Sequence, residues 1–408
     1  MSHQNPRLLL ASLLLVGCAA APTLAPGTDG GAPADSGGHD HDSDGAPPAS
    51  DGGAGGGDLA PTGVTTIRIH YPVGSHALAL RGDTAPLDWS HGVALTSTDG
   101  KTFIYTFPDL QAPAQFKPLL DDTAWSHGPN YTVTRGATVD VYPHFNATAG
   151  RVVNLFPNFH STLLNNNRNV WAYLPPSYDE NPLATFPVLY MHDGQNLFDP
   201  ALAFGGNEWK VDETLDGAAE GDGSIRELIV IGPENTSQRI YEYTPTTDPS
   251  TPGGGGGDLY LRMLVEELKP QVDAMLRTQP GRDTTGVMGS SLGGLISAYA
   301  GVTHPDVFGI VGAMSPSTWW NNDWIVGDVN KMPAAPMRPE RVYVDSGDSQ
   351  QADDANDTAQ LAAAYLGLGY VEGQSFHRVV QTGAQHNEVY WAQRLPGALG
   401  FLFGPRTP

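Results

Sequence analysis

Cysteine, positive charge and long apolar runs are all scarce in this chain of 408 residues. Cys18 is its single cysteine, so no disulfide can form within the chain. Lys and Arg number 21 against 44 Asp and Glu, which gives a formal net charge of −23. Nucleic acids and anionic membrane surfaces bind through Lys and Arg, so this balance argues against both as main partners. After the N-terminal segment, no apolar stretch is long enough to span a bilayer.

The first 18 residues have the pattern of a secretory signal. Arg7 precedes an apolar stretch that ends at Val16, and Cys18 follows two positions later. The sequence LVGC at 15–18 resembles the lipobox of bacterial lipoproteins, in which the cysteine is acylated and becomes the first residue of the mature protein. In that resemblance, Ala19 favours sorting to the outer membrane. We therefore expect an exported protein, lipid-anchored through Cys18 in the bacterial envelope; a plain signal peptide is the alternative.

Composition divides the rest of the chain into three parts. Residues 19–62 are mostly Gly, Ala, Pro, Ser and Asp, with almost nothing aromatic or branched. Such a segment cannot bury enough apolar surface to offset chain entropy, so it is predicted to be a disordered tether. A β-rich domain is predicted over 63–148, and an α/β domain over 149–408.

The β-rich segment has short apolar or alternating runs separated by turn signals, at 65–71, 77–80, 101–107, 114–120, 130–134 and 137–142. Strands at this regular spacing predict a small all-β sandwich. The segment resembles starch-binding-like and glycogen-binding-like β-sandwich modules through 80–82, 86–89, 116–119 and Trp125. We expect Trp89 and Trp125 in the core or an interface; stacking on a sugar ring, as in such modules, is the alternative.

In the last segment, near-continuous apolar runs alternate with helical patterns. The runs lie at 169–174, 186–191, 228–231, 285–288, 310–314 and 342–344, and the helical patterns at 259–276, 292–300 and 358–366. Buried apolar strands alternating with helices predict a mostly parallel sheet covered by helices on both faces. The expected fold class is therefore α/β.

A Gly-x-Ser-x-Gly pentapeptide lies between one apolar run and one helical pattern, at Gly289–Gly293. This is the layout of a nucleophile elbow, a sharp turn from strand to helix that exposes one serine hydroxyl. Ser291 is the candidate nucleophile. A serine needs a base within hydrogen-bond reach, and His386, near the C-terminus, suits that task.

Several motifs in order carry a resemblance to a known family. They are 173–178 (YLPPSY), 187–199 (PVLYMHDGQNLFD), Arg239, 242–245 (EYTP), 266–270 (EELKP), the elbow, and 386–388 (HNE). Together they resemble the esterase D-like family of α/β hydrolases, which includes feruloyl and acetyl xylan esterases, enterochelin esterases, S-formylglutathione hydrolases and mycolyltransferases. The resemblance implies an α/β-hydrolase fold and the chain order Ser, acid, His.

The resemblance also implies the remaining site residues. The acid is expected in the loop after the strand that ends near Val344, where the spacing departs from the family pattern. Asp348 is favoured, with Asp354 and then Asp353 as alternatives. One oxyanion donor is expected from the backbone N–H of Leu292. The other is expected from Gln195 or Gly194.

We therefore expect a serine carboxylic-ester hydrolase that works through an acyl-enzyme, without a metal or an organic cofactor. A carbohydrate-linked ester, feruloyl or acetyl, is the favoured substrate, given export and a candidate sugar-binding module. A siderophore trilactone of the enterochelin type is the alternative within the enzyme class. The alternative from another class is a non-catalytic, glycan-binding surface lipoprotein. The sequence leaves the oligomeric state open.

Overall fold

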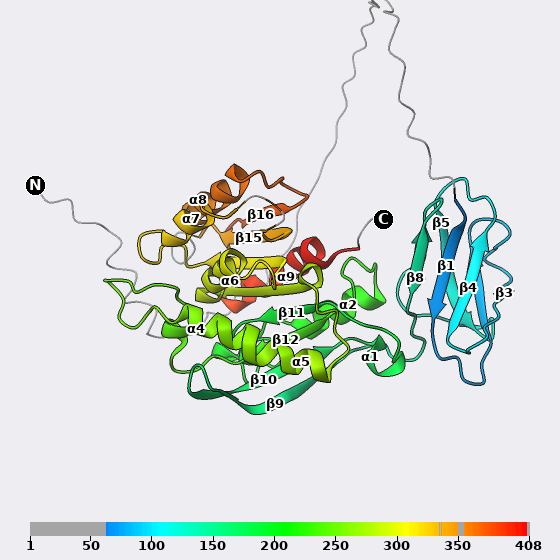
Figure 1. Cartoon of the computed structure of the whole chain (residues 1–408), viewed down its shortest axis with the longest axis horizontal. Coiled ribbons are helices and arrows are strands. Elements are labelled where there is room, and N and C mark those ends of the chain that lie inside the picture. Colours follow the sequence, from blue (N-terminus) through cyan, green and yellow to red (C-terminus); the bar gives the residue numbers. More distant parts are fainter. Residues whose placement is uncertain (1–62, 334, 336, 350–354, 406–408) are drawn as a thin grey trace, which may run out of the picture. The chain divides into compact units, whose positions relative to one another are not determined.

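The computed structural model describes residues 63–333, 335, 337–349 and 355–405 (Figure 1). The predicted signal peptide with Cys18, the predicted tether at 19–62, and the two alternative acids Asp353 and Asp354 lie outside these residues. In the part that is described, no helix combines the length and the apolar character needed to cross a membrane.

Eight strands between residues 65 and 141 form two small sheets. One sheet has the order β4-β1-β8; the other has the order β3-β2-β5-β6, with β7 also paired to β5. One hydrophobic cluster takes side chains from both sheets, among them Ile67, Leu80, Phe103 and Phe116. The strands are β1 (Thr65–His70), β2 (Leu78–Gly82), β3 (Val93–Ala94), β4 (Thr102–Phe107), β5 (Ala114–Leu120), β6 (Ala124–Trp125), β7 (Tyr131–Val133) and β8 (Thr138–Val141).

Trp89 and Trp125 lie on the surface of this segment, so they are not core residues; the expectation that they lie in an interface stays a prediction. Their exposed fractions are 37% and 40%. The inward positions of the two sheets are already filled by smaller aromatic and aliphatic side chains. The two indoles lie 6.2 Å apart between ring centroids, and the guanidinium of Arg81 lies 5.3 Å from the Trp125 ring centroid.

An eight-stranded sheet organises the rest of the chain, in the order β16-β15-β14-β13-β11-β12-β10-β9. The six strands from β11 to β16 run parallel, and β10 and β9 pair antiparallel at one edge. The predicted mostly parallel sheet is therefore confirmed. The strands are β9 (Arg151–Ser161), β10 (Asn166–Leu174), β11 (Val188–Met191), β12 (Ile229–Pro233), β13 (Thr285–Ser291), β14 (Ile310–Pro316), β15 (Arg341–Gly347) and β16 (Phe376–Gln381).

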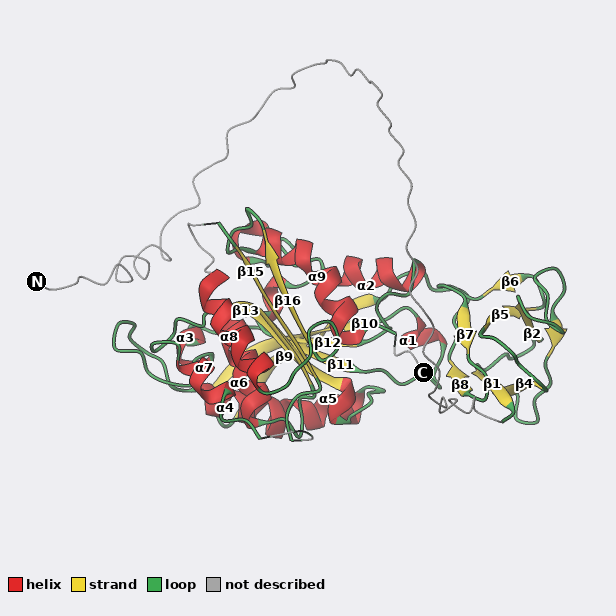
Figure 2. Cartoon of the chain, turned by 90° about the horizontal axis from the view of Figure 1, so that it is seen from above, coloured by secondary structure: helices red, strands yellow, loops and turns green. Residues whose placement is uncertain are grey.

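Helices cover both faces of this sheet (Figure 2). Alternate strand residues enter different clusters: Val188 and Tyr190 join the one that includes α6, whereas Leu189 and Met191 join the one that includes α9. The helices are α1 (Ser177–Glu180), η2 (Gly194–Asn196), η3 (Phe204–Gly206), α2 (Val211–Glu220), α3 (Arg239–Glu242), α4 (Gly257–Arg262), η4 (Met263–Leu268), α5 (Lys269–Met275), η5 (Arg282–Thr284), α6 (Leu292–Thr303), α7 (Trp324–Val329), α8 (Ala355–Gly367) and α9 (Glu388–Phe403).

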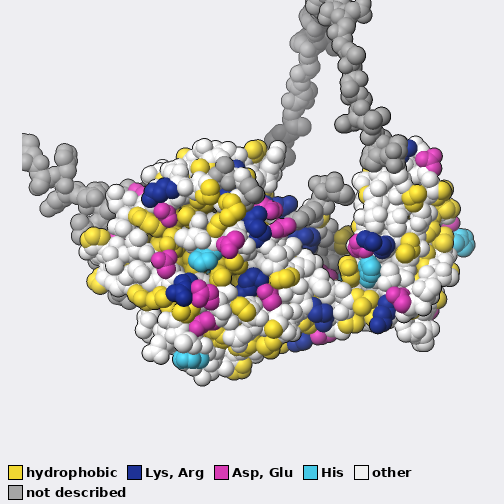
Figure 3. Space-filling view, viewed as in Figure 1, with side chains coloured by type: hydrophobic (Ala, Val, Ile, Leu, Met, Phe, Trp, Pro, Cys, Tyr) yellow, Lys and Arg dark blue, Asp and Glu magenta, His cyan; other side chains and the backbone are white. Residues whose placement is uncertain are grey.

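The helix predicted over 259–276 is divided in the structure. A π-helical turn, η4, separates α4 from α5. Pro270 has no N–H to donate in an α-helical ladder, and a π turn just before it changes the register of the hydrogen bonds. On the face in Figure 3, acidic and basic side chains are interspersed, so this view shows no large patch of one sign.

Candidate active site

Ser291 stands at a sharp turn between β13 and α6. Its backbone has φ 58° and ψ −123°, a region that non-glycine residues rarely occupy at a cost of about 1–3 kcal/mol. Gly289 is required beside it: a Cβ there would lie 2.9 Å from the His192 ring and 3.0 Å from the backbone of Gly293. The predicted elbow geometry is thus present, with Ser291 partly exposed at the turn.

The loops that carry the predicted site residues all lie at the carboxyl ends of the strands, because the strands before them are parallel. Gly194 follows β11, Ser291 ends β13, Asp348 follows β15 and His386 follows β16. In strand order, Gly194 lies on one side of Ser291, and Asp348 and His386 lie on the other. Ser317, which follows β14, is on the same side as His386.

Ser317 contacts the candidate nucleophile directly. The two hydroxyl oxygens, Oγ of Ser291 and Oγ of Ser317, lie 3.3 Å apart, within hydrogen-bond distance. The backbone N–H of Ser317 also donates to the carbonyl of Ser291 at 2.9 Å. The sequence analysis missed this residue; the only local signal is the tetrapeptide SPST at 315–318, whose first two residues end β14.

His386 lies half-buried in the loop between β16 and α9. Its ring meets Trp391 edge to face, with centroids 5.1 Å apart. Asp348, the favoured acid, accepts a hydrogen bond from the backbone N–H of Gly383 at 2.5 Å, and so ties the loop after β15 to the loop that carries His386. With two of the three candidate acids outside the described residues, the choice of the triad acid stays a prediction.

The predicted oxyanion loop begins at Gly194. A Cβ on Gly194 would lie 2.1 Å from the carbonyl oxygen of Gly232, so only glycine permits this approach to β12. The side-chain oxygen of Gln195 accepts the N–H of Asn235 at 3.2 Å, which leaves its backbone N–H and its side-chain NH₂ group as the groups that could serve as donors. Leu292, the other predicted donor, is the first residue of α6, where backbone N–H groups have no partner within the helix.

His192 and Asp193 shape this loop. Burial lowers the pKa of His192 to about 3, so its ring is neutral at physiological pH, and its Nδ1 lies 2.9 Å from the hydroxyl of Tyr260. Burial alone would raise the pKa of Asp193, but the Arg239 guanidinium lowers it through two hydrogen bonds of 2.8 Å. A paired carboxylate and a neutral buried imidazole suit a structural role.

A bulge in β14 lies directly beside the elbow. Ser290 pairs with Met314, whereas Ser291 pairs with Pro316, so Ser315 is the extra residue. Ser315 has φ 38°, another left-handed conformation at a non-glycine position. Bulges next to active sites redirect the side chains that follow them.

A buried ion pair holds this bulge in place. Asp345 accepts the N–H of Ser315 at 2.9 Å and pairs with Arg394 at 2.8 Å. The Ser315 hydroxyl accepts hydrogen bonds from Arg394 at 2.9 Å and from the indole of Trp391 at 3.1 Å. The ring that meets His386 is therefore anchored to the same network, none of which the sequence analysis identified.

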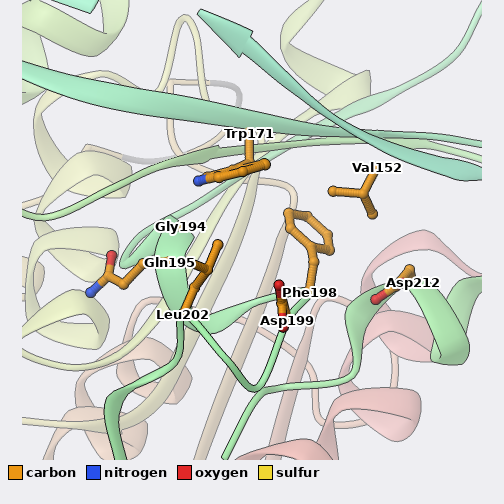
Figure 4. Close-up of a pocket in the computed structure, with 8 residues that line it drawn as sticks. All are labelled: Val152, Trp171, Gly194, Gln195, Phe198, Asp199, Leu202 and Asp212. Atoms are coloured by element: carbon orange, nitrogen blue, oxygen red, sulfur yellow. The ribbon is translucent and has the colours of Figure 1, made fainter. Parts of the chain in front are cut away.

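A pocket of about 290 Å³ borders the predicted oxyanion loop (Figure 4). It is lined by Val152, Trp171, Gly194, Gln195, Phe198, Asp199, Leu202 and Asp212. The pocket therefore combines aromatic and aliphatic walls with two carboxylates, and one of its walls is the segment predicted to supply an oxyanion donor.

Two further carboxyl groups gather around Asp212, one of the residues that line this pocket. Carboxylate oxygens of Glu208, Asp212 and Glu213 lie within 4.8 Å of one another, the one group of possible metal ligands that comes together in the described ranges. Burial and the neighbouring Glu213 raise the pKa of Asp212 to about 7. Burial, with help from Glu213, also raises the pKa of Glu208. Each added negative charge is therefore unfavourable here.

Comparison with protein families gives a match over the α/β part of the chain. The model of the family described as "Putative esterase" matches residues 161–402, more than half of the chain. That range includes the elbow, the oxyanion loop and the His386 loop.

Curated proteins similar to this chain include the following three. An uncharacterized protein of Bacillus subtilis, YbbA, is 29% identical over 252 residues, which cover 58% of this chain and 93% of the relative. Ferri-bacillibactin esterase BesA of Bacillus subtilis is 30% identical over 177 residues, 40% of this chain and 58% of BesA. An endo-1,4-beta-xylanase/feruloyl esterase of Xylanibacter ruminicola is 21% identical over 234 residues, 57% of this chain and 28% of that protein.

Proposed function

Because the chain belongs to the family described as "Putative esterase", it is a serine ester hydrolase, and we propose that it cleaves carbohydrate-linked esters, feruloyl or acetyl, through an acyl-enzyme on Ser291. The strained turn at Ser291 is the observation that carries the choice of nucleophile, because backbone strain of this kind clusters at active sites. The proposal covers the nucleophile, the base and the substrate class.

In the proposed mechanism, Ser291 Oγ attacks the ester carbonyl carbon while His386 takes the hydroxyl proton. The negative charge that develops on the carbonyl oxygen is stabilised by the N–H groups of Leu292 and of the Gly194–Gln195 segment. The bond to the leaving alcohol then breaks, and His386 gives its proton to the alcohol oxygen. Water repeats the sequence on the acyl-enzyme and releases the acid. A carboxylate, Asp348 in our preferred assignment, orients His386.

The pocket beside the oxyanion loop supports a neutral substrate. Trp171, Phe198 and Leu202 suit an aromatic or aliphatic group, and the carboxylates of Asp199 and Asp212 suit hydroxyl donors. A ferric siderophore trilactone is anionic, and like charges brought together at an interface are costly. The similarity to BesA is the observation that favours the siderophore alternative.

A comparison of two esters tests the substrate class. We expect kcat/KM for methyl ferulate to exceed that for a ferric catecholate trilactone by about 100-fold or more, because the anionic ligand meets the carboxylates of the pocket. Asp212→Asn should bring the two kcat/KM values closer together. Asp222 is an exposed carboxylate outside the pocket, so Asp222→Asn should leave their ratio unchanged. A preference for the trilactone would favour the siderophore alternative instead. Failure of both esters, and of a fluorophosphonate probe, would favour the non-catalytic glycan-binding alternative.

We also assign a sugar-binding role to the exposed indoles of Trp89 and Trp125. Paired aromatic faces on a surface offer a stacking platform, and Arg81 and Asp122, which pair at 2.8 Å, supply polar groups beside them. Acylation of Cys18 would keep the esterase at the cell envelope, where an attached sugar-binding domain would hold it on a polymer.

The tryptophan pair makes a separate prediction. Replacing Trp89 and Trp125 together by Ala should lower retention on insoluble xylan by about ten-fold, the effect of losing two aromatic contacts. Hydrolysis of p-nitrophenyl acetate should not change, because that ester needs no polymer. Tyr142→Ala, which removes another exposed aromatic ring of the same segment, is the matched control. Equal retention of the double variant and the unaltered protein would contradict the assignment.

A further inference from the structure

Ser317 is more than a neighbour of the candidate nucleophile, because its position is fixed from several directions. It is only 2% exposed. Its N–H donates to the carbonyl of Ser291, and its own carbonyl accepts the N–H of Trp320 at 3.1 Å. These two hydrogen bonds fix the backbone of Ser317, and with it the place from which the side chain approaches Ser291.

The bulge at Ser315 explains how the hydroxyl of Ser317 comes to this place. A regular strand would continue the β13–β14 pairing, but the extra residue shifts the register by one just before Ser317. The left-handed backbone of Ser315 is unfavourable by itself, and the Asp345–Arg394 pair compensates for it. Strain that the surroundings hold in place beside a reactive group points to a function.

We propose that Ser317 is a catalytic residue whose hydroxyl donates a hydrogen bond to Ser291 Oγ while that atom carries negative charge; the inference rests on the proposed function of Ser291. In the resting enzyme, the two hydroxyls share one hydrogen bond of 3.3 Å. When the Ser291 proton passes to His386, the Ser317 O–H becomes the donor to an oxygen that is gaining charge. Hydrogen bonds to charged oxygens are shorter and about twice as strong as neutral ones.

The same hydrogen bond serves the second half of the reaction. Ser291 Oγ is the leaving group when water opens the acyl-enzyme, so it carries charge again until His386 returns the proton. Ser317 keeps its own proton throughout, and no further reactant is needed. In strand order it lies on the His386 side of the nucleophile, opposite the oxyanion loop. It therefore stabilises an atom that the two oxyanion donors do not reach.

Kinetics of two variants of the full chain test this role. Ser317→Ala should lower kcat for p-nitrophenyl acetate by about 10- to 100-fold with KM nearly unchanged, as expected for a hydrogen bond to a charged group. The rate of phosphonylation by a fluorophosphonate should fall by a similar factor, because that reaction uses the same nucleophile. Ser317→Cys, which keeps a weak donor of similar size, should recover part of both rates. Thr318→Val is the matched control, since it removes a buried hydroxyl one residue further along without touching Ser291.

Each outcome is informative. Ser317→Ala with kcat and phosphonylation rate within two-fold of the unaltered enzyme overturns the proposal, although Ser291 would remain the nucleophile. Equal losses in Thr318→Val, or a loss that follows a lowered melting temperature, also overturn it, because they indicate a structural role. An unaltered protein that reacts with neither the ester nor the fluorophosphonate contradicts the proposed function itself.

Discussion

Replacing Ser291 by Ala is expected to lower kcat/KM for p-nitrophenyl acetate by about 10⁴- to 10⁶-fold. Alanine keeps the elbow but removes the oxygen that forms the acyl-enzyme, and only binding and the oxyanion donors remain to assist hydrolysis. The measurement is steady-state hydrolysis by the intact chain, with labelling by a fluorophosphonate as a second readout.

Ser290→Ala is the matched control for this experiment. Ser290 is the adjacent serine of the same pentapeptide, and it is buried to 4% exposure within β13. Its side chain is buried whereas that of Ser291 is partly exposed, so the variant should retain activity within a few-fold. If Ser291→Ala kept most of the activity and still reacted with the fluorophosphonate, the nucleophile would have to be sought elsewhere.

The second large effect is on stability, at the buried pair of Arg394 and Asp345. Their side chains are 4% and 0% exposed. Arg394→Met should lower the free energy of unfolding by about 3–5 kcal/mol, because it leaves the buried carboxylate of Asp345 without a charged partner. Such a loss corresponds to a fall of roughly 10 °C in melting temperature. Thermal unfolding followed by circular dichroism measures it.

The loss in this variant should depend on pH. Burial raises the pKa of Asp345 above its ordinary value of 3.8, against the opposing effect of Arg394. Without Arg394 the folded-state pKa rises further. A carboxyl whose pKa is higher in the folded than in the unfolded state loses stability as pH rises through the folded value. The deficit should therefore be larger at pH 8 than at pH 5.

Two controls separate the pair from general effects of the substitution. Arg262→Met breaks an exposed pair, with side chains 45% and 50% exposed, and should cost no more than about 0.5 kcal/mol. Adding Asp345→Leu to Arg394→Met should recover much of the stability, since no unpaired charge is left inside. A deficit that is the same at both pH values and is not recovered by the second change would show that the stranded charge is not its cause.

The sequence was informative where structure and chemistry leave a local signature. The apolar runs of β11 to β15 and the pentapeptide at the elbow each lie within a dozen residues, so they could be identified without tertiary information. Other elements were hidden by residues that contradict the local pattern. α9 contains Pro396 and β9 contains Pro157, which helices and central strands avoid. β9 tolerates its proline because it is an edge strand.

The parts of the site that could not be predicted depend on contacts between distant segments. Ser317 reaches Ser291 only through a bulge that Asp345 and Arg394 hold from two other elements. The pocket is lined both by Trp171 of β10 and by Asp212 of α2, residues that are distant in sequence and come together only in the folded protein. A large apolar side chain such as that of tryptophan is ordinarily predicted to be buried. Only the structure shows that other side chains fill the interior and that Trp89 and Trp125 are exposed.

The distance along the chain between the site's parts has a consequence for how the protein is made. Asn196, beside the oxyanion loop, meets Glu388, two residues after His386, across 192 positions of sequence at 3.5 Å. The residues of the elbow leave the ribosome well before those of α9, and a domain generally folds as a unit, so the candidate nucleophile meets the candidate base only when the last helix is available. Hydrolytic capacity should therefore appear only when the C-terminal helix docks. Newly made chains would stay chemically inert until folding is nearly complete.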